Sequence, residues 1–156
     1  MMLKQQGGDV SCAAEATSEY GRLLAAYGDP LEALRCQRDA YERVQGLQDG
    51  FSEPAVGNDF GETLTVLGRY QEAIATYAEA LSRAERQHRR YEQARAHAGI
   101  AAASHHTDPA AAESARAAAL TLFQTTGMGP DEALGMLARH PANAAPRTPK
   151  QHDLDT

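Results

Sequence analysis

Residues 60–80, FGETLTVLGRYQEAIATYAEA, contain the pattern that decides the predicted fold of this chain. A segment with small residues precedes Gly68, and a segment with apolar residues three and four positions apart follows it. This spacing predicts two amphipathic helices joined by a short turn. Because two antiparallel helices approach closely where a small residue replaces a bulky one, we expect Gly61 and Ala73 to form such a contact.

The same pattern occurs once before and once after this stretch. The earlier copy contains Tyr20-Gly21, Leu24, Gly28, Ala33 and Ala40, and a weaker later copy contains Ala98-Gly99, Ala102, Ala112 and Ala119. The small residues at 33, 73 and 112 lie 40 and 39 positions apart. We therefore predict an all-α fold, an α-solenoid of about three antiparallel helical hairpins. The expected helices cover residues 12–27, 30–47, 53–67, 70–88, 91–105, 109–126 and 130–139, the last being a short C-terminal capping helix.

Two of the expected helices carry a start signal. Asp29 precedes Pro30, with Glu32 two positions later, and Asp108 precedes Pro109. An Asp before a Pro is typical of a helix N-cap followed by the first helical residue. The helix expected at residue 70 lacks such a signal, because only a flexible Gly-Arg-Tyr turn precedes it.

The middle copy resembles the tetratricopeptide (TPR) repeat family. Phe60-Gly61 stands where that family has Leu-Gly, Ala73 and Tyr77 stand at its Ala-x3-Phe positions, and Ala80 occupies the next small position. The long period is similar to the TPR regions of actinobacterial multidomain transcriptional regulators, and the excess of Ala and Arg is typical of a GC-rich bacterial genome. The resemblance covers about residues 12–139. It implies a protein- or peptide-binding module, an intracellular regulatory adaptor or a detached part of a regulator, and not an enzyme.

TPR proteins bind their ligands in a concave groove that the first helix of each hairpin lines. The matching positions in this chain are Ser18 and Arg22 in the first copy and Asn58, Glu62 and Thr65 in the second. The resemblance therefore implies that these five residues form the partner-binding groove, with Ala96 as the candidate in the third copy. The alternative is that they are exposed polar residues of amphipathic helices without a ligand.

The chain divides into three predicted parts. Residues 11–139 form the TPR-like helical repeat domain, and residues 1–10 form a disordered N-terminus. Residues 140–156 form a disordered C-terminal tail, because Pro141, Pro146, Pro149 and their polar neighbours bury too little apolar surface to order themselves.

Charge and composition exclude several classes of partner. The formal net charge of -6 offers no basic surface for phosphate backbones, so we expect no direct nucleic-acid partner. No stretch approaches the roughly 18 apolar residues of a membrane span, and the N-terminus lacks the apolar region of a signal peptide. Cys12 and Cys36 lack metal-ligand spacing and are expected to be reduced thiols, which favours a cytoplasmic location.

Two other classes of function stay open. Glu85 and His88 have the spacing of a carboxylate and an imidazole on one helical face, and His105 and His106 precede Asp108 in a turn. These residues would serve a helical metal-binding protein or enzyme. A single Glu-x-x-His is insufficient for a di-iron site and no common catalytic motif is present, so we expect no catalytic residue, no metal site and no cofactor. The other alternative is a self-associating scaffold, a homo-oligomer in which an uncapped first hairpin buries its apolar side against a second copy.

Overall fold

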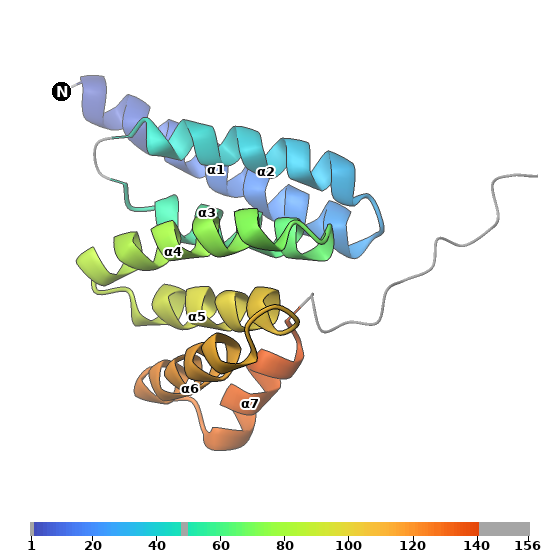
Figure 1. Ribbon diagram of the computed structural model, residues 1–156. Coiled ribbons are helices and arrows are strands. Elements are labelled where there is room, and N and C mark those ends of the chain that lie inside the picture. Colours follow the sequence, from blue (N-terminus) through green and yellow to red (C-terminus); the bar gives the residue numbers. More distant parts are fainter. Residues whose placement is uncertain (1, 48–49, 141–156) are drawn as a thin grey trace, which may run out of the picture.

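The computed structural model describes residues 2–47 and 50–140, and every regular element in those residues is an α-helix (Figure 1). The helices are α1 (Met2–Ala26), α2 (Pro30–Gln45), α3 (Glu53–Val66), α4 (Tyr70–Arg86), α5 (Arg90–Ser104), α6 (Pro109–Thr125) and α7 (Pro130–Ala138). The predicted all-α class is confirmed. None of these helices combines the length and the apolar character that crossing a membrane requires.

Most helix starts agree with the sequence pattern, and the start of α1 does not. Helices α2, α3, α4, α6 and α7 begin at the predicted residues, and α5 begins one residue early at Arg90. Helix α1 begins at Met2, whereas the pattern places its start at residue 12 and a disordered segment before it. Good helix formers occupy residues 2–6 and no Pro interrupts the chain before residue 12, so the helix continues through Gly7 and Gly8 although glycine disfavours it.

The helices are stacked in chain order. Each helix packs against the next one along the chain, α1 also contacts α3, and α3 also contacts α5. In Figure 1, α1 and α2 lie at one end of the molecule and α7 lies at the other end. A larger apolar cluster joins α1 to α5 and includes Leu34, Val44, Val56, Leu64 and Tyr77. A smaller one joins α5, α6 and α7 through Ala94, Ala98, Ala119, Phe123, Ala133 and Leu137.

Tyr77 of α4 lies fully buried against two glycines of neighbouring helices. A Cβ atom at Gly61 of α3 would lie 2.6 Å from Tyr77 Cε1, and one at Gly99 of α5 would overlap the same ring. The atoms nearest to a Cβ at Gly61 thus belong to Tyr77, one helical turn beyond the expected Ala73. Ala73 is also fully buried and belongs to the same apolar cluster.

Both predicted N-caps are confirmed. The Asp29 carboxylate accepts a hydrogen bond from the Glu32 backbone N–H at 3.2 Å, and Asp108 accepts one from Ala111 at 3.0 Å. The residue before α4 makes no side-chain capping bond, as the sequence indicates. Five turns of the described chain contain one residue with a left-handed backbone, and it is Gly28, Gly50, Gly68, His88 or Gly127.

Candidate partner-binding site

A buried ionic network joins α3 to α5. Arg95 of α5 donates hydrogen bonds to Asp59 Oδ1 at 2.7 Å and to Glu62 Oε1 at 2.9 Å, both on α3. It also donates to Glu92 Oε2, one turn earlier on its own helix, at 3.2 Å. The side chain of Arg95 is only 13% exposed. One guanidinium therefore balances three carboxylates where the two helices meet.

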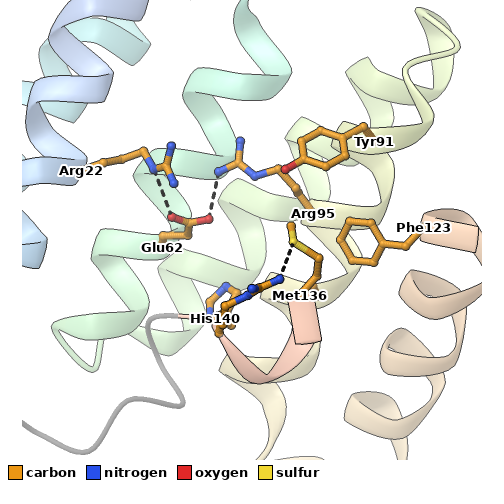
Figure 2. Close-up of a pocket in the computed structure, with 9 residues that line it drawn as sticks. Arg22, Glu62, Tyr91, Arg95, Phe123, Met136 and His140 are labelled. Atoms are coloured by element: carbon orange, nitrogen blue, oxygen red, sulfur yellow. Dashed lines mark hydrogen bonds and ion pairs between the residues drawn. The ribbon is translucent and has the colours of Figure 1, made fainter. Parts of the chain in front are cut away.

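Arg22 extends this network to α1. Its Nε atom lies 3.7 Å from Asp59 Oδ1 and 3.8 Å from Glu62 Oε2, and its Nη1 atom donates to Glu19 at 3.1 Å. Figure 2 shows Glu62 between the guanidinium groups of Arg22 and Arg95. Nearly half of the Arg22 side chain is exposed, so this residue is both a member of the network and part of the surface.

Burial and charge act in opposite directions on the pKa values of this network. Burial alone would lower the pKa of Arg95, but Glu62, Asp59 and Glu92 outweigh it and raise that pKa well above its ordinary value. Burial raises the pKa of Asp59, and the ion pair with Arg95 opposes this rise only in part. Asp59 is therefore a carboxylate whose ionised form depends on its neighbours.

Four of the five predicted groove residues belong to this network or bond directly to it. Ser18 Oγ donates to Asp59 Oδ2 at 2.7 Å, and Asn58 Nδ2 donates to the Glu92 backbone oxygen at 3.0 Å and to its Oε2 atom at 2.9 Å. Arg22 and Glu62 are joined by the ion pair described above. The fifth residue, Thr65, donates to the backbone oxygen of Gly61 on its own helix.

Only two of these five residues present their side chains to the surface. Ser18, Asn58 and Thr65 are each at most 2% exposed, and the hydrogen bonds above hold them within the chain. Arg22 is exposed and Glu62 is partly exposed. The candidate Ala96 is also buried, and its neighbour Arg95 projects into the network instead.

A cavity of about 260 Å³ opens beside the network. Residues from α1, α3, α5, α6 and α7, together with the two residues that follow α7, line it: Arg22, Glu62, Tyr91, Arg95, Ala98, Phe123, Met136, Arg139 and His140. The rings of Tyr91 and Phe123 meet edge to face with their centroids 6.0 Å apart, and Met136 lies near them in Figure 2. The cavity thus has an apolar wall and a cationic edge.

Arg139 is the cation of this edge without a carboxylate partner among the residues that the structure describes. Its Nη2 atom lies 3.7 Å from the sulfur of Met136, and no Asp or Glu oxygen lies within ion-pair distance of it in the described chain. Arg139 is exposed. A cation at the mouth of a partly apolar cavity attracts an anionic group of a ligand.

His140 is part of the folded domain and not of a tail. It is 8% exposed, and its Nε2 atom lies 3.3 Å from the hydroxyl of Tyr77. Burial lowers the pKa of His140, and Glu62 opposes this effect. The predicted tail boundary at residue 140 is therefore one residue too early, and residues 141–156 lie outside the described chain.

Sequence reasoning missed most of the cavity residues. Arg95 has a local signal, since it stands in an alanine-rich segment with Glu92 one turn before it. Tyr91, Phe123, Met136 and Arg139 have no such signal. They come together only because α5, α6 and α7 pack around one point.

The alternative histidine residues are not gathered into one site. Helix α4 ends at Arg86, so His88 lies in the next turn and does not share a helical face with Glu85. The rings of His105 and His106 contact each other, 4.9 Å between centroids, and Asp108 caps α6. Within residues 2–47 and 50–140, no three His, Cys, Asp or Glu residues come together as a metal site would require.

Neither a protein-family model nor a curated protein matches this chain. The resemblance to TPR repeats therefore rests on the middle copy. In the structure Phe60 and Gly61 are buried in α3, and Ala73, Tyr77 and Ala80 are buried in α4. Of these residues, Gly61 lies directly against the ring of Tyr77.

Proposed function

We propose that the chain is a TPR-like α-solenoid of three hairpins, α1–α2, α3–α4 and α5–α6, capped by α7, and that it binds a peptide segment of another protein as an intracellular regulatory adaptor. The contacts of α1 with α3 and of α3 with α5 support this arrangement, because the first helices of successive TPR hairpins line one groove. The free thiols Cys12 and Cys36 fit a reducing cytosol.

The observation that carries this proposal is the cavity lined by Arg22, Arg95 and Arg139 together with Tyr91, Phe123 and Met136. Its volume of about 260 Å³ lies below the roughly 300–1,000 Å³ of sites that enclose a whole small ligand. A cavity of this size receives a part of a larger ligand. An extended peptide offers such parts as single side chains.

The lining chemistry selects an acidic residue next to an apolar one. The apolar side chain of the peptide packs between Tyr91, Phe123 and Met136, and its carboxylate pairs with Arg139 and the exposed part of Arg22. A guanidinium binds a carboxylate through two parallel hydrogen bonds, which gives orientation as well as affinity.

The ionic network prepares the site for such a ligand. Both carboxylate oxygens of Glu62 are already used, Oε1 by Arg95 and Oε2 by Arg22. Glu62 therefore repels an incoming carboxylate less than a free Glu would. Because the network is formed without the ligand, little side-chain ordering is needed on binding.

A peptide-display selection on the full chain tests the proposal. We expect the enriched peptides to combine Asp or Glu with a neighbouring apolar residue. Titration of an enriched peptide should give a dissociation constant at least about tenfold weaker for the Arg22→Ala, Arg139→Ala double variant, which is roughly 1.4 kcal/mol. Asn58 is not a suitable target, since it is buried and its loss would disturb α5.

The matched control is the double variant Arg86→Ala, Arg116→Ala. Both arginines are exposed, on α4 and α6, and neither lines the cavity. This control should bind the peptide as the unmodified protein does and keep the same helical circular dichroism. The proposal fails if no peptide is enriched, or if the control loses binding while the Arg22, Arg139 variant keeps it.

A further inference from the structure

Helix α1 carries an apolar stripe that no described part of the chain covers. Ala13, Ala16, Tyr20, Leu23 and Tyr27 are all exposed and follow one another at intervals of three, four, three and four residues. The Tyr27 backbone N–H donates to the Leu23 oxygen, so the helical path continues through the last of them. Residues with this spacing share one face of a helix. We call this face the α1 stripe.

The α1 stripe is part of a larger concentration of exposed apolar surface. Nine large apolar residues of the described chain are exposed, and five of them lie between residues 10 and 31. Tyr27 is 85% exposed and Leu31, at the start of α2, is 71% exposed. Single exposed apolar residues are ordinary on protein surfaces, but a regular row of them on one helix marks an interaction surface.

Two of the three charged residues of α1 between residues 10 and 26 point away from this stripe. Glu15 accepts a hydrogen bond from Ser52, and Arg22 pairs with Asp59 and Glu62, so both side chains point towards α3 and the residues before it. Glu19 pairs with Arg22 and lies at the border of the α1 stripe, three residues after Ala16 and four before Leu23. No charged residue of α1 between residues 10 and 26 interrupts the α1 stripe. A helix face exposed to water in the functional state would carry charges, as the outer face of α2 does with Arg35, Arg38, Asp39 and Glu42.

The two ends of the helix stack differ in whether another helix covers them. At the C-terminal end, α7 covers α6 and buries Ala133 and Leu137. At the other end, α1 and α2 are the last helices in Figure 1, and the residues of the α1 stripe are exposed there. A stack of helices needs a polar outer face at each end to stay in solution as a single chain.

We propose that the α1 stripe is the interface of a homodimer, in which α1 packs antiparallel against α1 of a second copy. Side-chain size along the stripe is the reason for a second copy and for the antiparallel direction. The small residues Ala13 and Ala16 occupy its first half, and the large residues Tyr20, Leu23 and Tyr27 occupy its second half. An antiparallel pair places the small half of each copy against the large half of the other, so the stripe is complementary to itself.

The dimer goes beyond the proposed peptide binding and does not depend on it. The α1 stripe and Arg22 lie on different sides of α1, so the cavity of each copy stays open. A dimer with two open cavities binds a partner that carries two copies of the peptide, or a dimeric partner, more tightly than one copy does.

Sedimentation equilibrium of the full chain over a concentration series tests the dimer. We expect a mass approaching twice the 16.7 kDa of the chain. The variant Leu23→Glu, Tyr27→Glu should raise the dimer dissociation constant by at least about tenfold, because each copy then buries two charges. Since both side chains are exposed in the single chain, its helical circular dichroism should not change.

The control is Leu134→Glu on α7, which is 44% exposed and lies outside the α1 stripe. It should dimerise like the unmodified chain. A monomer at every concentration overturns the proposal, whether or not another protein covers the stripe. A dimer that the Leu23, Tyr27 variant retains overturns it as well.

Engineered disulfides test the antiparallel direction in a background with Cys12→Ser and Cys36→Ser. A chain with Ala13→Cys and a tagged chain with Tyr27→Cys should form a mixed disulfide on mild oxidation, because the antiparallel pair brings these two ends of the stripe together. A chain with Tyr27→Cys alone should not link to itself, because antiparallel copies hold the two Tyr27 positions at opposite ends. Efficient self-linking at residue 27 would show a parallel pair and overturn the proposed arrangement.

Discussion

The ring of Tyr77 fills the space next to two glycines. The core therefore requires glycine at both positions. The ring lies against Gly61 of α3 and Gly99 of α5, where a Cβ atom has no room. Both glycines lie inside helices, where Gly is usually less stable than Ala by roughly 0.5–1 kcal/mol. The packing of one tyrosine between three helices outweighs this preference.

Replacing Gly99 with Ala should therefore lower the free energy of unfolding by about 1–3 kcal/mol, the usual cost of overpacking. Urea unfolding followed by circular dichroism measures this change. Gly135→Ala on α7 is the matched control, since its Cβ would meet nothing nearer than the Arg139 side chain at 3.5 Å. The control should be neutral or more stable, by up to about 1 kcal/mol. A Gly99→Ala protein as stable as the control would contradict the packing of Tyr77.

His140 gives the domain a dependence on pH. Burial lowers its pKa below the ordinary 6.5 in the folded protein, so the unfolded chain binds a proton more readily than the folded one. Stability from neutral His140 is complete above pH 6.5 and is lost as the pH falls below it. The charged groups Glu62 and Arg95 act on His140 in opposite directions, with Arg95 adding to the effect of burial.

We expect the unmodified protein to lose more stability between pH 7.5 and 5.5 than the variant His140→Gln does. Each unit by which the pKa of His140 differs between the folded and the unfolded chain corresponds to at most about 1.4 kcal/mol of unfolding free energy. Urea unfolding at both pH values measures the two losses. His97 on α5 also has a pKa lowered by burial, but it is present in both proteins and cancels in the comparison. Equal losses would show that His140 does not titrate differently on folding.

At the scale of the elements, five of the described turns place one residue in the left-handed region, and four of these residues are glycines, Gly50 in the turn after α2 among them. The turns after α1, α3 and α6 place Gly28, Gly68 and Gly127 in the left-handed region, with φ of 96, 75 and 95°. The turn after α4 places His88 there, with φ of 54°. A side chain in this conformation costs roughly 1–2 kcal/mol, which a glycine avoids.

His88→Gly should accordingly stabilise the protein by up to about 1 kcal/mol, since part of the gain is lost to the greater freedom of glycine in the unfolded chain. The measurement is the urea midpoint. The reverse change at an equivalent turn, Gly68→Ala, should shift the midpoint in the opposite direction. If His88→Gly proves less stable than the unmodified protein, the side chain of His88 makes a contact that matters more than its backbone.

The elements could be predicted where the determining residues are close in sequence. Asp29, Asp108 and Gly68 act on residues within a few positions, so the caps and turns were readable from the sequence. The partners of Ser18 and Asn58 lie on other helices, at Asp59 and Glu92, and no local pattern reports them. Because Ser18 and Asn58 are polar, the sequence suggested that they are exposed. Polar side chains are, however, commonly buried when they are hydrogen-bonded. The cavity residues of α5 to α7 could not be predicted for the same reason.

At the scale of the whole molecule, the ionic network holds three helices that are far apart in the chain. Arg22, Asp59 and Arg95 connect α1, α3 and α5 with little access to water at Arg95. A buried ion pair contributes little net stability when it replaces a good apolar contact, but removing one member leaves the others uncompensated. The network should therefore enforce one relative position of the three helices.

Arg95→Met should lower the free energy of unfolding by about 3–5 kcal/mol, because Asp59, Glu62 and Glu92 lose their shared cation. It should also weaken the coupling between hairpins, seen as a smaller dependence of stability on urea concentration. Arg86→Met, at an exposed position of α4, should change stability by no more than about 0.5 kcal/mol. An Arg95→Met protein that unfolds like this control would show that the network is dispensable.

The position of Tyr77 also has a spectroscopic consequence. The chain contains six tyrosines and no tryptophan, and Tyr77 is the one whose ring is wholly enclosed in the part of the chain that the structure describes. A tyrosine ring held in one asymmetric environment contributes to circular dichroism in the near ultraviolet, whereas a freely rotating ring on the surface contributes little. The near-ultraviolet signal of this protein, to which the buried Tyr41 of α2 also contributes, should thus report whether α2 to α5 are tightly packed, separately from the far-ultraviolet signal of their helices.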